Sequence, residues 1–159
     1  MGCDNSGGVH VIGHFSDTAS FSGQSVVSAG SYDVYWAKYD TAGSLQQLHR
    51  AGGSGTDYGY GILTDPSGDL HLTGAISNMV IVGNDTLLSS GFTDGFLMHC
   101  DSAGDPVHAV RFGGTGSEFG TDLARTSNND IGVSGYFDGS LNMGSGLLVA
   151  AGSRDAYLA

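Results

Sequence analysis

An acidic residue stands next to an aromatic residue at two places in this chain, and the two places are 61 residues apart. The pairs are Asp57–Tyr58 and Glu118–Phe119. An acid beside an aromatic ring can hold a sugar, a peptide or a cation, since the carboxylate binds donors or positive charge and the ring face stacks. We therefore expect Asp57, Tyr58, Glu118 and Phe119 to be ligand-binding residues at loop tips.

Both pairs close a glycine-rich segment, GGSGTDYG at 52–59 and GGTGSEFG at 113–120. Their glycine spacing does not fit the dinucleotide-binding fingerprint, and no Lys-Ser or Lys-Thr follows, so nucleotide chemistry is not expected. A loop that recurs with its glycines intact is typical of a connection made in every repeat. We expect these glycines to supply positive φ and close backbone approach.

The whole chain repeats with a period of 61 residues and no gaps. Three positions occur three times at this spacing: Gly13, Gly74 and Gly135; Gly30, Gly91 and Gly152; and Asp33, Asp94 and Asp155. The 159 residues therefore hold about 2.6 copies of one unit.

The repeated acids Asp33, Asp94 and Asp155 are candidate calcium ligands in an acidic chain. Their surroundings do not follow the D-x-[DN]-x-[DN]-G pattern of a calcium loop. The alternative is a carboxylate that accepts backbone N–H groups where a strand begins. Arg50 and Arg111, just before each glycine loop, are expected to pair either with these acids or with the acids of the loop.

Histidine offers a second candidate for metal binding. His10 and His14 form H-x-x-x-H, which on a helix can hold zinc. On a strand the two lie about 13 Å apart, too far for one ion. His71 repeats His10, and packed or rim-exposed imidazoles are the alternative.

Each repeat consists of short apolar segments separated by D-x-x-G turns, with no helical periodicity, which predicts an all-β fold. In these turns the aspartate caps the backbone and the glycine takes the left-handed conformation. The expected left-handed residues are Gly43, Gly68 and Gly104, and Asn129 in the third copy. Asparagine is the other residue that tolerates this conformation.

Charge and cysteine content exclude several classes of partner. Five Lys and Arg face 16 Asp and Glu, for a net charge of −11, so nucleic acid and anionic membrane surfaces are not expected partners. No apolar run is long enough to span a membrane. Cys3 and Cys100 lack metal-ligand spacing and are expected to be unpaired thiols.

Two stretches resemble the SBBP-type β-propeller repeat of bacterial proteins. They are DPSGDLHLTGAI and SSGFTDGFLMHCDSAGDPVHAVRFGGTGSEFG, and the first copy matches with Gly30, Asp33, Tyr35, Lys38 and Asp40. The resemblance covers nearly the whole chain. It implies four-stranded antiparallel blades, usually about seven to a ring. It also implies a secreted or cell-surface location, and it supplies no catalytic residues.

The expected architecture is therefore one all-β domain over residues 1–159, an incomplete propeller with blade fragments at 1–57, 58–118 and 119–159. About 2.6 blades cannot close a ring, so the remaining blades are expected from a longer parent chain or, alternatively, from an oligomer.

The expected function is a non-enzymatic scaffold or recognition module that binds a protein or carbohydrate through loop tips. No cofactor is expected, and calcium remains open. The alternatives are part of a propeller enzyme acting on carbohydrate, and a calcium-stabilised repeat protein.

Overall fold

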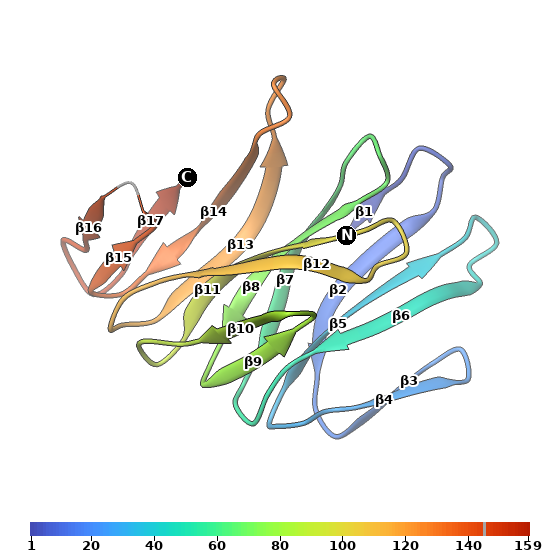
Figure 1. Ribbon diagram of the computed structural model, residues 1–159, viewed down its shortest axis with the longest axis horizontal. Coiled ribbons are helices and arrows are strands. Elements are labelled where there is room, and N and C mark those ends of the chain that lie inside the picture. Colours follow the sequence, from blue (N-terminus) through green and yellow to red (C-terminus); the bar gives the residue numbers. More distant parts are fainter. Residues whose placement is uncertain (145) are drawn as a thin grey trace.

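The computed structural model describes residues 1–144 and 146–159, and this part of the chain is all-β. Its strands form three main antiparallel sheets and three separate hairpins (Figure 1). The first sheet has the order β1-β2-β5-β6, with bounds β1 Gly2–Cys3, β2 Val9–Phe15, β5 Asp33–Tyr39 and β6 Leu45–Ala51. The second has the order β7-β8-β11-β12, with bounds β7 Tyr58–Thr64, β8 Leu70–Ile76, β11 Asp94–Cys100 and β12 Pro106–Phe112.

The third sheet has the order β13-β14-β17, with bounds β13 Glu118–Arg125, β14 Ile131–Phe137 and β17 Asp155–Leu158. In each unit a hairpin stands between the second and third strands. The hairpins are β3 Thr18–Phe21 with β4 Gln24–Val27, β9 Met79–Val82 with β10 Asp85–Leu88, and β15 Ser140–Asn142 with β16 Leu147–Val149. The strands β2, β8 and β14 begin 61 residues apart, as the sequence period predicts.

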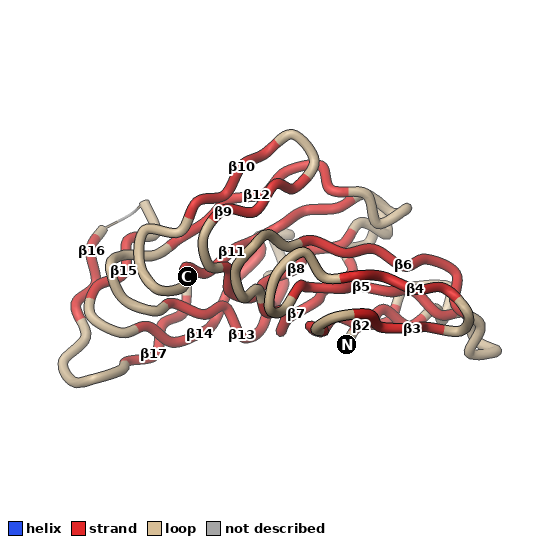
Figure 2. Tube along the Cα trace, turned by 90° about the horizontal axis from the view of Figure 1, so that it is seen from below, coloured by secondary structure: helices blue, strands red, loops and turns tan. Residues whose placement is uncertain are grey.

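The three sheets follow one another across the molecule, and the tube in Figure 2 shows the same succession from below. The strand β7 packs against β1 and β2 on one side and against β13 on the other. The first strands of successive sheets are therefore neighbours. Within residues 1–144 and 146–159, no helix is long and apolar enough to cross a membrane.

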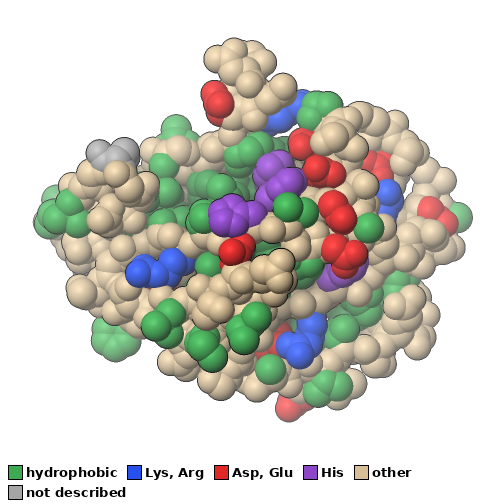
Figure 3. Space-filling model, viewed as in Figure 1, with side chains coloured by type: hydrophobic (Ala, Val, Ile, Leu, Met, Phe, Trp, Pro, Cys, Tyr) green, Lys and Arg blue, Asp and Glu red, His purple; other side chains and the backbone are tan. Residues whose placement is uncertain are grey.

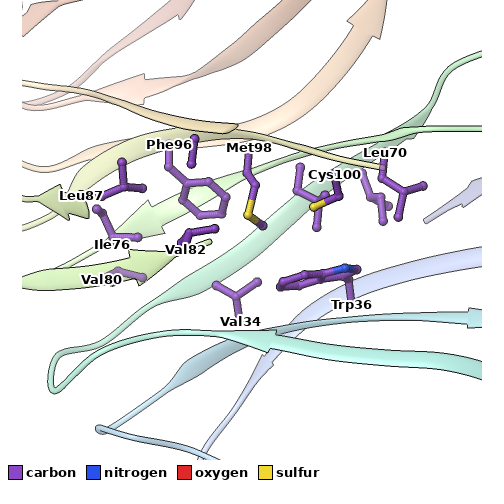
Figure 4. Packing of buried hydrophobic residues seen from close by; sticks show 13 residues of the cluster. Val34, Trp36, Leu70, Ile76, Val80, Val82, Leu87, Phe96, Met98 and Cys100 are labelled. Atoms are coloured by element: carbon purple, nitrogen blue, oxygen red, sulfur yellow. The ribbon is translucent and has the colours of Figure 1, made fainter. Parts of the chain in front are cut away.

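The larger hydrophobic core lies between the first two sheets. Val34 and Trp36 of β5 face Phe96, Met98 and Cys100 of β11 (Figure 4). Each such side chain contributes roughly 1.5–3 kcal/mol when it leaves water. A smaller core, which includes Phe112, Leu123, Val133, Phe137 and Leu141, joins the second sheet to the third.

Trp36 also carries a polar contact between these sheets. Its indole Nε1 donates a hydrogen bond of 3.0 Å to the carbonyl oxygen of Gly104. The ring stacks on His49, with centroids 5.4 Å apart. The D-x-x-G turn of the second unit is thus tied to the core strand of the first.

The hairpin turns have the backbone that their residues require. Gly43, Gly68 and Gly104 have φ of 78°, 93° and 85°, and Asn129 has φ of 69°. In the first of these turns, Asp40 Oδ1 accepts the N–H groups of Ala42 at 2.9 Å and Ser44 at 2.8 Å. The side chain thereby satisfies backbone donors that no strand partner reaches.

The glycine-rich loops differ from expectation in one respect. Gly52, Gly53, Gly55 and Gly59 do not have positive φ, so that half of the prediction is wrong. Close backbone approach is confirmed. A Cβ on Gly53 would overlap with the carbonyl oxygen of Met79, and one on Gly114 with that of Ser140. Each loop is glycine-rich because the next unit's backbone passes against it.

Candidate functional site

Asp57 lies inside the protein and not at a loop tip. Its carboxylate has no exposed surface. The Oδ2 atom accepts the N–H of Gly53 at 2.8 Å, and Oδ1 accepts the N–H of Ser77 at 3.0 Å. Burial raises the pKa of Asp57 to about 6, and the nearby charge of Asp33 acts in the same direction. The side chain fastens the glycine loop to the end of β8.

Glu118 has the corresponding position between the second and third sheets. It is fully buried, and Oε2 accepts the N–H of Gly114 at 2.9 Å. Its other oxygen, Oε1, has no hydrogen-bond partner among the described residues. Burial raises the pKa of Glu118 to about 7, with Asp94 and Asp138 adding to the shift and Arg111 opposing it.

The burial of these two acids differs from the expected exposure. Sequence places them beside glycines, which suggests an exposed loop, but the close packing that those glycines permit encloses the carboxylates. A carboxylate without accessible surface does not reach a ligand directly. Ligand binding by Asp57 and Glu118 themselves therefore finds no support in their positions, whereas Tyr58 and Phe119 keep part of their surface exposed.

The repeated aspartates accept backbone N–H groups where a strand begins. Asp33 Oδ2 accepts the N–H of Ala29 at 3.0 Å, and Asp155 Oδ2 accepts that of Ala151 at 2.8 Å. Asp94 Oδ2 accepts the N–H of Ser90 at 3.1 Å. The first two copies each gain an arginine: Arg50 Nη1 lies 2.6 Å from Asp33, and Arg111 Nη1 lies 2.5 Å from Asp94.

These three aspartates belong to three different sheets. Within residues 1–144 and 146–159, no three His, Cys, Asp or Glu side chains gather so that they could hold a metal ion. Calcium ligation by Asp33, Asp94 and Asp155 thus finds no clustered ligand set in the described part of the chain.

Aromatic side chains from all three units form a continuous row, which we call the aromatic row. Its members are Tyr32, Tyr58, Tyr60, Phe119 and Tyr136. The ring centroids of successive members lie 5.8, 5.9, 6.3 and 4.7 Å apart. Two of these contacts, Tyr58 with Tyr60 and Phe119 with Tyr136, are stacked.

A basic or titratable side chain stands at each part of this row. His14 lies edge-on to Tyr32, Tyr58 and Tyr60, at centroid distances of 5.6, 4.8 and 5.9 Å. At the far end the guanidinium carbon of Arg154 lies 4.3 Å from the centroid of Tyr136, a cation–π contact. Arg154 Nε also donates to Asp138 Oδ1 at 2.9 Å.

The row remains open to solvent. Tyr32 is 38% exposed and Tyr60 is 37% exposed, and the other three rings are half-buried. Rings that are packed against one another lose little conformational freedom when a ligand stacks on them. The negative ring faces attract C–H groups and cations that carry partial or full positive charge.

The histidines outside the row pair with carboxylates. The Nε2 atom of His99 lies 3.2 Å from Asp69 Oδ2, and His108 Nδ1 lies 2.8 Å from Asp85 Oδ2. His71 stacks on His99 at 5.1 Å. Figure 3 shows such histidines among acidic side chains on one face. Burial lowers the pKa of His71 and of buried His10, as expected for packed neutral imidazoles.

Sequence reasoning found Tyr58 and Phe119 but missed the rest of the row. Tyr60 had a signal, since residues two apart on a strand share a face. The bulge between Gly59 and Gly61 complicates that signal, because it adds one residue to β7. Tyr32, Tyr136 and Arg154 come from other sheets, so only the packing of the sheets reveals them.

No known family model matches this chain, and no curated protein matches it. The resemblance to the SBBP-type repeat therefore remains a prediction based on the residues quoted above.

Proposed function

We propose that this protein is a non-enzymatic recognition module that binds a polysaccharide along the aromatic row. The observation that carries the proposal is the continuity of five partly exposed rings across three sheets. A sugar ring presents a face of C–H groups, which stacks on an aromatic face. Successive rings in a row suit a ligand that itself consists of successive rings.

The neighbouring polar groups suit the rim of a sugar ring. The phenol oxygens of the tyrosines both donate and accept hydrogen bonds, and His14 lies exposed beside three of them. The acidic surface, with a net charge of −11, favours a neutral ligand over an anionic one. We place the protein outside the cell or on its surface, where polysaccharides are accessible.

In the same proposal the three sheets are blades of an incomplete β-propeller. Two observations support this arrangement: each unit repeats the order of its strands, and the first strands of successive units are neighbours. In such an arrangement the row runs across the starts of the inner strands, because Tyr58 opens β7 and Phe119 stands near the start of β13. A ring would be completed by further blades.

Affinity electrophoresis in gels that contain cellulose derivatives, soluble chitin derivatives or xylan tests the proposal. We expect at least one of these polysaccharides to retard the wild-type protein. Tyr60→Ala removes an exposed ring from the middle of the row and should abolish most of the retardation. Tyr60→Phe keeps the ring and should preserve most of it.

The control variant is Tyr39→Ala, at the opposite end of β5 from the loop that carries Tyr32. It removes a half-buried tyrosine outside the row and should leave retardation unchanged. If no polysaccharide retards the wild type, or if Tyr60→Ala and Tyr39→Ala behave alike, the proposal is wrong.

A further inference from the structure

We propose that the outer edge of β17 binds an extended polypeptide strand with the sequence pattern apolar-x-Arg-apolar. This surface is separate from the aromatic row. The strands β5 and β11, which correspond to β17, each lie between two partners. Within the described residues β17 pairs with β14 alone, so the backbone groups on its other side have no strand to bind.

The two complete sheets show how a strand would sit on this edge. The strand β6 pairs antiparallel with β5, and β12 pairs antiparallel with β11. In both, an arginine lies opposite the third residue of the central strand: Arg50 opposite Tyr35, and Arg111 opposite Phe96. The corresponding residue of β17 is Tyr157, so the incoming arginine is expected there.

Charge complementarity selects that arginine. Asp33 and Asp94 each bind the arginine of the adjoining outer strand. Asp155 has the same place in β17 and accepts the N–H of Ala151, but no arginine lies beside it among the described residues. An incoming strand with arginine opposite Tyr157 would complete the third copy of this ion pair.

Packing selects an apolar residue two positions before the arginine. In β12 this residue is Ala109, which is buried in the core next to the β9–β10 hairpin. Leu87 in that hairpin is 5% exposed, whereas its counterpart Leu148 in β16 is 49% exposed. The end of the molecule near β15–β17 displays apolar side chains in Figure 3.

A hollow adjoins this edge and is ready to accept apolar side chains. It has a volume of about 460 Å³, and its lining includes Phe112 from β12, Val133 from β14, Met143 and Ala159. The pattern of the expected ligand is present in this chain as LHRA at 48–51 and AVRF at 109–112. Addition of a strand to a sheet edge combines main-chain hydrogen bonds with such side-chain selection.

A second copy of the chain fits this edge poorly. If β17 paired with β17 of another molecule, it would bring two Asp155 carboxylates and no arginine to the interface. Two chains of net charge −11 also repel each other. We therefore assign the edge to a different, arginine-bearing strand.

Two peptides and two proteins test the assignment. The first peptide copies residues 44–52, SLQQLHRAG, and the second carries Arg50→Ala. The proteins are the wild type and Asp155→Asn, which keeps an oxygen that can accept the N–H of Ala151. Fluorescence anisotropy measures the affinity of each labelled peptide for each protein.

We expect saturable binding of the first peptide to the wild type. Either the Arg50→Ala peptide or the Asp155→Asn protein should weaken binding by about fivefold, the size of one partly exposed charged pair. If Arg and Asp155 contact each other, the two changes together should weaken it no more than either change alone.

Three results would overturn the assignment. They are no saturable binding up to about 1 mM peptide, equal affinity of the two peptides, and effects that simply add in the double change. Self-association of the wild type that Asp155→Asn alters, measured by sedimentation velocity, would assign the edge to a second copy and overturn the proposal as well.

Discussion

The carboxylates of Asp94 and Glu118 meet at Gly113, at the junction of the second and third sheets. A Cβ on Gly113 would lie 2.7 Å from Glu118 Oε2 and 2.9 Å from Asp94 Oδ2. Arg111 binds Asp94, so one arginine serves a site with two buried acids. Two like charges in a site of low dielectric constant favour protonation of one of them. Glu118 is the acid that holds the proton.

Replacing Glu118 by glutamine should therefore change how stability depends on pH. Folded Glu118 keeps its proton up to about pH 7, whereas the unfolded residue releases it near 4.5, so the folded state binds more protons in this window. Raising the pH from 4.5 to 7 should thus lower the free energy of unfolding by up to about 3 kcal/mol through this residue.

Glu118→Gln should lack this fall, because glutamine does not titrate. The variant should be about 1 kcal/mol less stable than the wild type at pH 5 and at least as stable at pH 8. Urea denaturation at pH 5, 6, 7 and 8 measures both. Parallel pH profiles for the two proteins would contradict a raised pKa. Glu118→Gln keeps an acceptor for the N–H of Gly114, so its fold should persist.

Close backbone approach makes Gly114 sensitive to the smallest substitution. A Cβ on this residue would overlap with the carbonyl oxygen of Ser140, and neither backbone can move without displacing a sheet. Gly114→Ala should lower the free energy of unfolding by about 3 kcal/mol or more. The matched control is Gly152→Ala, whose Cβ would meet nothing within 4 Å. Equal midpoints of urea denaturation for the two variants would contradict this account.

Local sequence patterns were sufficient to predict much of the fold. The all-β class, the 61-residue period and the D-x-x-G turns depend on neighbouring residues, and the structure confirms them in strands such as β2, β8 and β14. A turn aspartate such as Asp40 caps donors two and four residues away, so its role can be read locally.

Features that depend on contacts between units could not be predicted in the same way. Asp57 is buried because Ser77, 20 residues later, returns to bind it. Tyr32 and Tyr136 join the aromatic row only through the packing of separate sheets. The expected positive φ of the loop glycines failed for the same reason, since packing and not a turn requires glycine there.

The left-handed backbone of Asn129 gives a prediction for the turn of the third unit. Its φ is 69°, and its N–H donates to the carbonyl oxygen of Thr126 at 3.1 Å. Asn129→Ala should cost about 1 kcal/mol, because alanine has no side-chain group that favours this conformation. Asn129→Gly should be nearly neutral. The control Asn128→Ala, at an exposed neighbour without positive φ, should change stability by less than about 0.5 kcal/mol.

The two free thiols should report on the first and second sheets at very different rates. Cys3 is exposed, whereas Cys100 is fully buried in the larger core. Burial raises the pKa of Cys100 to about 12, with the charges of Asp101 and Asp105 adding to it. The thiolate is the reactive form, so Cys100 should not react in the folded protein at pH 8. With Ellman's reagent we expect one thiol to react quickly in the native protein and the second only in denaturant. Cys3→Ser should abolish the fast reaction and leave the slow one. Two fast thiols in the native wild type would show that β11 opens without global unfolding, and that the core between the first two sheets is not the cooperative unit described above.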